Sequence, residues 1–211
     1  MIGGADRRAG RGPFDSRLCA ACVLALCWPT QAQAHNVVKT LGAFWAGVVH
    51  PLISPDQLGV LLALAIWIVW RPRRAEIFLA ILPLGAFLGA WLAPSGAPFP
   101  RLTPAAMAFF GVMAAARVGR AKLWVECLAA AFGGVSVGVA SVAGAEDAPR
   151  VLFALGVAFA VASLTAYALL AARHLARIPS WIETGARSGA GVIAILGIGL
   201  FAASAVGWLQ L

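Results

Sequence analysis

Charged residues are scarce in this chain, and tyrosine is almost absent. Only 11% of the 211 residues are charged, and the chain contains a single Tyr. By contrast, 62% of the residues are apolar and the mean hydropathy is +0.89. A soluble globular domain is about one quarter charged, so this composition excludes a water-soluble enzyme. It also excludes a disordered chain, because such chains lack apolar residues. The sequence therefore predicts a polytopic membrane protein, with the lipid bilayer as its first partner.

The positive charge has a topological rather than a nucleic-acid interpretation. Sixteen Lys and Arg residues face eight Asp and Glu residues, which gives a formal net charge of +8. Nucleic-acid binding needs cations clustered on one face, but here they stand between apolar stretches, as topology signals do. The sequence contains no phosphate loop, zincin motif or hydrolase elbow. We therefore predict neither a nucleic-acid partner nor an enzymatic activity.

The first 34 residues have the three parts of a signal peptide. Residues 7–17 carry four arginines, residues 18–28 form a short apolar core, and Ala32-Gln33-Ala34 is a small-x-small cleavage site. The apolar core has 11 residues, too few to span a bilayer, which needs about 20. We predict that residues 1–34 are removed and that residues 35–211 form the mature membrane domain. An uncleaved anchor is the alternative.

Apolar runs separated by charge and turn signals follow in the mature chain. A short segment, residues 37–49, comes first, and the longer runs are 55–70, 75–93, 102–118, 122–143, 149–172 and 186–209. With six crossings, nine of the twelve mature Lys and Arg residues lie in the cytoplasm, as the positive-inside rule requires. A full crossing by residues 37–49 would invert that bias.

These charges predict an all-α membrane bundle of six transmembrane helices, preceded by a re-entrant half-helix. The protein would be a multi-pass protein of the bacterial inner membrane, with both mature termini in the periplasm. Two pairs with small-xxx-small spacing, Gly85 with Gly89 and Gly134 with Gly138, would let helices approach closely.

The segment before the first long run has the features of a broken helix. Residues 37–49 give about 20 Å of helix against a hydrocarbon core of about 30 Å, so they cannot cross alone. The segment is predicted to end at His50-Pro51, because proline disfavours helical geometry in the residue before it. Ser54-Pro55-Asp56-Gln57 resembles a helix start, with Ser54 and Gln57 as a capping box. We expect Trp67, Trp70 and Arg71 to anchor the inner end of that helix at the cytoplasmic interface.

His50 and Asp56 would then lie where irregular backbone meets a half-helix at membrane depth. Ionisable residues at such depth are candidates for function, and transporters place ion sites at half-helix ends. An imidazole with a carboxylate suits Ni²⁺, Co²⁺ or Zn²⁺. Cleavage after Ala34 would add the α-amino group and imidazole of His35, a pair suited to Cu²⁺ or Ni²⁺. We predict His50, Asp56 and His35 as metal ligands.

Roles without a metal also fit these residues. His50 would satisfy free backbone groups at the broken helix, and Asp56 would favour the positive end of a helix dipole. His35 would stand beside the cleavage site by chance.

The residues around the broken helix resemble a known family. Gly42-Ala43-Phe44, Gly47 and the run from His50 to Gln57 are similar to the HupE/UreJ membrane proteins associated with hydrogenase and urease. Their signature is His-Pro-x-x-Gly-x-Asp-His, soon after a signal peptide. The resemblance implies a nickel or cobalt permease that supports metallo-enzyme maturation, with His50 and Asp56 in the places of the first His and the Asp.

The chain departs from this family pattern at several positions. Ser54 replaces the Gly of the signature, and Gln57 replaces its second His. A second family signature, Phe-His-x-x-Ala-His-Gly-x-Glu, falls on residues 132–140, where Gly133 and Val137 stand in place of the two His and Ala140 in place of the Glu.

Two functions follow from the sequence. The first is an inner-membrane permease or acquisition protein for a divalent metal, of nickel or cobalt type, with copper and zinc as further candidates. The alternative is a non-transporting accessory or scaffold protein that has lost the family metal site. No permanently bound cofactor is expected. The expected partners are the transported metal ion and either a second copy of the chain or a maturation protein.

The leader gives a direct prediction. N-terminal sequencing of the purified protein is expected to begin at His35, because the cleavage site lies after Ala34. A protein that still begins at Met1 would be an uncleaved anchor, and His35 would then have no free α-amino group for a metal.

Overall fold

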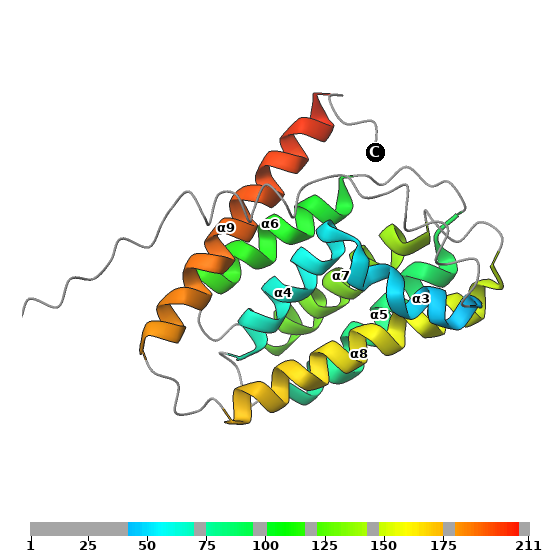
Figure 1. The fold of residues 1–211 in the computed structure, drawn as a ribbon, viewed down its shortest axis with the longest axis horizontal. Coiled ribbons are helices and arrows are strands. Elements are labelled where there is room, and N and C mark those ends of the chain that lie inside the picture. Colours follow the sequence, from blue (N-terminus) through cyan, green and yellow to red (C-terminus); the bar gives the residue numbers. More distant parts are fainter. Residues whose placement is uncertain are drawn as a thin grey trace, which may run out of the picture. The chain divides into compact units, whose positions relative to one another are not determined.

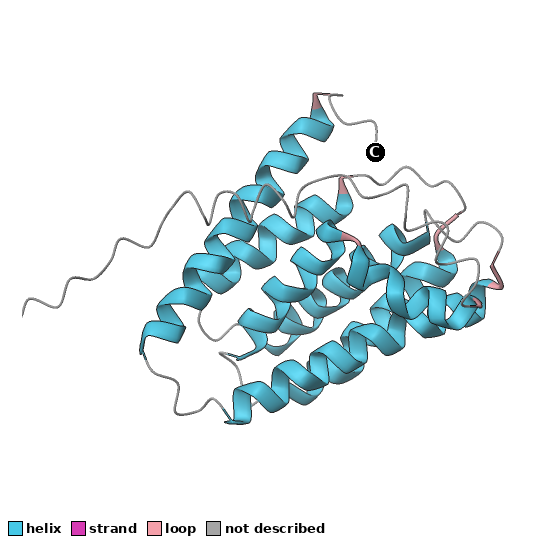
Figure 2. Cartoon of the chain, in the orientation of Figure 1, coloured by secondary structure: helices cyan, strands magenta, loops and turns pink. Residues whose placement is uncertain are grey.

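The computed structural model describes residues 42–69, 75–94, 101–116, 122–142, 148–174 and 180–206. These residues belong to one compact unit, Gln31–Leu211, and they form seven α-helices and no strand (Figures 1 and 2). The helices are α3 (Ala43–Ile53), α4 (Pro55–Val69), α5 (Ala75–Leu92), α6 (Leu102–Ala115), α7 (Leu123–Ser141), α8 (Arg150–His174) and α9 (Ser180–Ala205).

The predicted all-α fold is confirmed, and each of the six long apolar runs corresponds to one helix from α4 to α9. The largest difference is the start of α9, which precedes its apolar run. The predicted leader, residues 1–34, and His35 lie outside the described residues.

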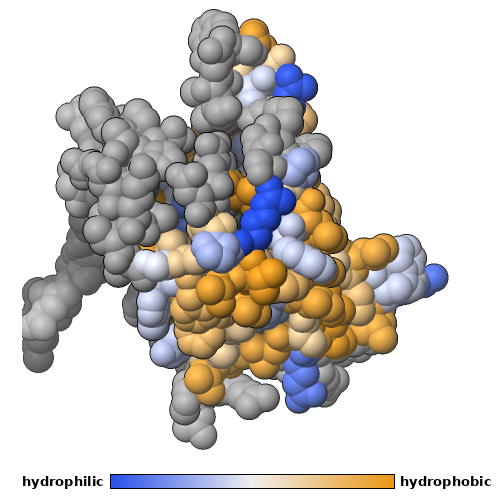
Figure 3. Space-filling view, turned by 90° about the vertical axis from the view of Figure 1, so that its right-hand side faces the viewer, coloured by the Kyte–Doolittle hydropathy of each residue, from blue (hydrophilic) through white to orange (hydrophobic). Residues whose placement is uncertain are grey.

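Three helices, α7, α8 and α9, are long and apolar enough to cross a membrane. The pair α3 and α4 passes the same test together, with a bend of 75° at the break between them. The apolar helices α5 and α6 are shorter. The described part of the chain thus contains up to four spans by length and composition, and the count of six stays a prediction. Large apolar side chains lie exposed on several helices, and Figure 3 shows them over much of one face.

Helix α4 lies in the middle of the bundle, in contact with α3, α6, α7, α8 and α9 (Figure 1). Its apolar side chains face inward on most sides, and Trp67 is only 1% exposed. The Trp67 ring packs edge-on against Phe78 of α5 and is tilted against Phe110 of α6. The prediction that Trp67 anchors the helix at the interface is therefore wrong, because neighbouring helices cover this end of α4. Trp70 and Arg71, the other two predicted anchors, lie outside the described residues.

Helices α5 and α7 meet through two glycines on each. A Cβ added at Gly85 or Gly89 would press on the α7 backbone, and one added at Gly134 or Gly138 would press on the α5 backbone. The predicted close approach through these small residues is confirmed, and the two pairs lie against each other. Lipid tails are as apolar as the side chains, so association within a bilayer depends on such van der Waals packing.

The same arrangement joins two further helix pairs. Gly47 of α3 lies against the α8 backbone, and Gly156 of α8 lies against the α3 backbone. Gly111 of α6 and Gly197 of α9 lie against each other's helices in the same way. Six of the seven described helices are therefore joined in closely packed pairs, and α4, which lies outside these pairs, contacts members of all three.

Two arginines add a polar connection between α6 and α9. Arg101, at the start of α6, donates from Nη2 to the carbonyl oxygen of Ser204 near the end of α9, at 3.2 Å. Arg187 of α9 donates from Nε to the carbonyl oxygen of Ala115 at the end of α6, also at 3.2 Å. Each cation therefore lies at the C-terminal end of the other helix, where the helix dipole favours positive charge.

The glycine contacts predict a specific pattern of stability. Gly134→Ala is expected to lower the thermal unfolding midpoint in detergent, because the added methyl group must push α5 away; overpacking of this kind costs about 1–3 kcal/mol. Gly199→Ala in α9 is the matched control, since its Cβ would meet no atom within 4 Å. Both changes raise helix propensity equally. The same midpoint for both variants would contradict the packing described above.

Candidate metal site at the break between α3 and α4

The chain changes direction at Ser54, the residue between α3 and α4. Its backbone N–H and its hydroxyl both donate to the carbonyl oxygen of His50, at 3.2 and 2.9 Å. Its own carbonyl oxygen accepts from the N–H of Leu58 at 2.9 Å. One residue in an extended conformation therefore ends α3 and begins α4.

Helix α3 ends later than the sequence predicts. Instead of stopping at His50-Pro51, it continues through Pro51 to Ile53. A proline inside a helix removes one N–H donor and crowds the preceding turn. Here Pro51 lies in the last turn, and the two hydrogen bonds from Ser54 to His50 hold that turn closed. The predicted boundary is wrong for this reason, and His50 belongs to the helix.

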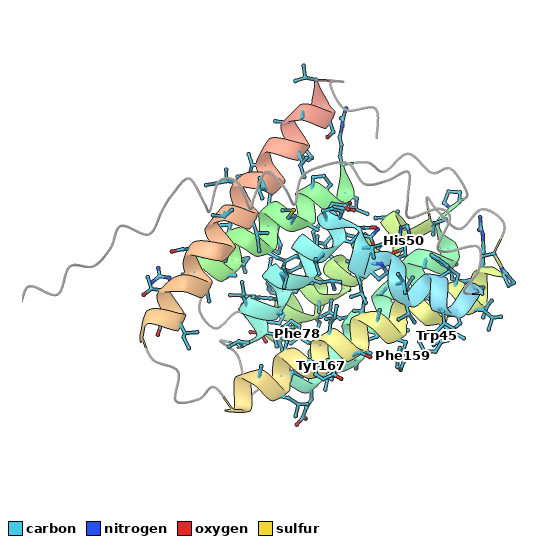
Figure 4. The ribbon with its side chains drawn as sticks, in the orientation of Figure 1. Trp45, His50, Phe78, Phe159 and Tyr167 are labelled. Atoms are coloured by element: carbon cyan, nitrogen blue, oxygen red, sulfur yellow. The ribbon has the colours of Figure 1, made fainter. Side chains whose placement is uncertain are left out.

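His50 lies half-buried in the last turn of α3. Its imidazole ring is edge-on to the ring of Phe153 in α8, with the centroids 6.2 Å apart. Figure 4 shows His50 near the start of α4, with Trp45 toward the other end of α3. The imidazole is thus placed between α3 and the first half of α8.

Asp56 is the second residue of α4 and is half-buried. Its carboxylate lies close to the backbone N–H groups of Asp56 and Gln57. These are among the N–H groups that the first turn of a helix leaves without intrahelical acceptors. Asp56 therefore has the dipole-favoured position that the sequence indicates. Its two oxygens have further lone pairs with which to bind a cation.

Gln57 is one of the largest fully buried side chains of the protein, at 2% exposure. Its Oε1 accepts a hydrogen bond from the hydroxyl of Ser141, the last residue of α7, at 2.9 Å. The predicted capping box is wrong, because the Ser54 hydroxyl bonds back to α3 and the Gln57 amide bonds to α7. Ser141 was not predicted, since a serine in a helix of small residues gives no signal of its partner.

The second signature falls on a part of α7 that faces the apolar interior. A Cβ at Gly133 would lie 3.0 Å from side-chain atoms of Leu64 in α4 and Phe110 in α6. Val137 is completely buried in the hydrophobic core. The two positions that hold His in the family signature are therefore packed against apolar neighbours and supply no ligand.

The described site thus offers one imidazole and one carboxylate, on either side of the break. No group of three His, Cys, Asp or Glu side chains that could hold a metal occurs in the part of the chain that the structure describes. His35, the third predicted ligand, lies outside it. Further ligands for a cation would have to come from other oxygen donors, such as the Gln57 amide, or from water.

Comparison with known proteins gives one finding. Residues 23–201 match the family model described as HupE / UreJ protein. The match covers all seven described helices apart from the end of α9. The chain matches no curated protein and no solved structure.

The packing of Gly133 gives a prediction about restoring the second signature. Gly133→His is expected to lower the thermal unfolding midpoint, because the imidazole would have to displace Leu64 and Phe110. Gly185→His in α9 is the control, since a Cβ there meets no atom within 4 Å. A Gly133→His protein as stable as the control would show that α7 has room for a ligand.

Proposed function

Because the chain belongs to the HupE/UreJ family, we propose that it is an inner-membrane permease or acquisition protein for a divalent metal ion. Family membership implies an accessory or nickel- and cobalt-related transport role in a membrane. The metal proposed here is nickel or cobalt, with copper and zinc as further candidates. The imported ion would serve the maturation of metallo-enzymes. The metal ion is the cargo, not a resident cofactor.

The broken helix pair is the observation that carries this proposal. It places an imidazole in the last turn of α3 and a carboxylate in the first turn of α4, on either side of a 75° bend. Discontinuous helices of this kind form the ion sites of secondary transporters. An ionisable residue in a membrane-embedded segment is costly and is retained for function.

The chemistry of the two side chains fits a partly dehydrated borderline cation. The Asp56 carboxylate supplies negative charge, and a neutral His50 supplies a nitrogen ligand that Ni²⁺ and Co²⁺ accept. Because the imidazole must lose its proton before it binds a metal, uptake is expected to weaken as the outer medium becomes acidic.

A second function has support from one observation. The α7 positions that would complete the family site are packed with apolar atoms, as expected of a scaffold that no longer binds metal. In this case the protein would be a non-transporting accessory protein with a stable membrane-embedded or periplasmic partner.

Cellular metal accumulation tests the permease. His50→Ala and Asp56→Asn are each expected to reduce accumulation of nickel or cobalt at least tenfold, because loss of a supporting group near a metal already costs about 10–100-fold. Mass spectrometry of washed cells gives the metal content, and immunoblotting of membranes gives the protein level. Glu76→Gln, a change at an exposed carboxylate in the first turn of α5, is the control.

Accumulation equal to the parent in both variants would contradict the permease. Co-purification of a stable partner, unaffected by chelators and by both substitutions, would then support the accessory function.

A further inference from the structure

Glu126 is a buried carboxylate that the proposed cation site does not use. It lies in the first turn of α7 and is only 3% exposed. Moving a carboxylate out of water costs free energy, and charged side chains inside membrane helices are rare and functional for this reason. Glu126 is therefore a candidate for a role in transport.

Glu126 lies on the face of α7 that packs against α4. A Cβ at Gly133 would lie 3.0 Å from the side chain of Leu64 in α4. Toward the other end of α7, the hydroxyl of Ser141 donates to Gln57 of α4. Glu126 precedes Gly133 by seven residues, which is close to two helical turns, so both residues point the same way. The α4 side of α7 thus carries Glu126 at one end and Ser141 at the other.

Between these two ends, the contact between α4 and α7 is apolar. Ala130 and Val137 have the same helical spacing as Glu126 and are completely buried. Ser141 is the fifteenth residue after Glu126, which corresponds to about 22 Å of helix at 1.5 Å per residue. The α4–α7 seam therefore has a polar side chain at each end and apolar packing between them.

The two ends of this seam lie on opposite sides of the bundle. The Ser141 end is beside the break between α3 and α4, because its partner Gln57 is the third residue of α4. Residues 117–122, just before the Glu126 end, contain three Lys and Arg residues, as expected of a cytoplasmic loop. Glu126 thus lies at the end where an ion that enters at the break would leave the bundle.

The helix dipole does not account for the burial of Glu126. Helices α5 and α7 run parallel, because their glycines meet in the same order along both chains, and so they begin at the same end of the bundle. The first turn of α5 also carries a carboxylate, Glu76, but that side chain is exposed. An exposed carboxylate is enough to favour the positive end of a helix dipole. The burial of Glu126 therefore has another cause.

We propose that Glu126 is a second cation-binding group, at the inner end of the α4–α7 seam, and that it binds the transported divalent cation just before release. This inference rests on the proposed function and deepens it, because it assigns the exit of the pathway. Water completes the shell of the cation, since the described residues hold no group of three His, Cys, Asp or Glu side chains. One carboxylate makes a weak site, as release requires: a conducted ion must bind firmly enough to enter and weakly enough to leave.

The test is the initial rate of nickel uptake by cells at a series of outer nickel concentrations, divided by the amount of the protein in the membrane. Glu126→Gln removes the charge at almost the same volume. It is expected to lower the maximal rate per molecule about tenfold. The concentration that gives half of that rate is expected not to rise, because loading at the break is unchanged. Glu126→Asp keeps the carboxylate and is expected to recover most of the rate.

Glu76→Gln is the matched control, because Glu76 is also a carboxylate in the first turn of a helix that begins at the same end, but it is exposed. This variant is expected to take up nickel like the parent. A purely structural role for Glu126 would lower the amount of protein in the membrane and leave the rate per molecule unchanged.

The outcomes separate this inference from the proposed function. A rate per molecule for Glu126→Gln equal to that of Glu76→Gln would overturn the inner site and leave the permease standing. A rise in the half-saturating concentration that accounts for the whole loss would also overturn it, because the effect would then lie at the entrance. Nickel uptake by the parent no greater than that of cells without the protein would instead contradict the permease, and the inner site with it.

Discussion

Backbone groups in a bilayer have no water to hydrogen-bond with, and this constraint governs the break between α3 and α4. The break consists of one residue, Ser54. Its N–H and its hydroxyl both donate to the carbonyl oxygen of His50, and its carbonyl oxygen accepts from the N–H of Leu58. The carboxylate of Asp56 lies beside the N–H groups of the first turn of α4. Because the groups of Ser54 are satisfied locally, the chain bends by 75° within a single residue.

The position of α4 follows from how the other helices pair. Three pairs, α3 with α8, α5 with α7 and α6 with α9, each place glycine against helix backbone. Together they surround α4, which buries Trp67 at one end and Gln57 at the other. The central helix thus carries the polar residues of the break into the bundle.

Much of the fold could be predicted because local pattern determines it. The apolar runs give the helices, and Pro55 at a first helical position marks the start of α4. The glycine spacing indicates that α5 and α7 each approach another helix closely, but it does not indicate that the two pack against each other. Family membership also followed from the sequence, since the run around His50 and Asp56 is local.

Two of the wrong predictions have the same physical cause, which is competition from a tertiary partner. The residue types and spacing of Ser54 and Gln57 fit a capping box, but the hydroxyl of Ser141 on α7 donates a hydrogen bond to the Gln57 amide oxygen. Trp67 fits an interfacial anchor by its position, but Phe78 and Phe110 enclose it. The end of α3 differs for a local reason, because the hydrogen bonds from Ser54 to His50 close the helix beyond Pro51. A single sequence contains no record of these distant contacts.

The arginine contacts at the two ends of α6 and α9 limit how this pair can move. A slide of one helix along the other by a single turn, about 5.4 Å, would separate both guanidinium groups from their carbonyl oxygens at once. It would also bring larger side chains to the places where Gly111 and Gly197 allow the backbones to touch. Sliding would therefore cost both contacts at once, so we expect α6 and α9 to move together as one unit if the bundle rearranges.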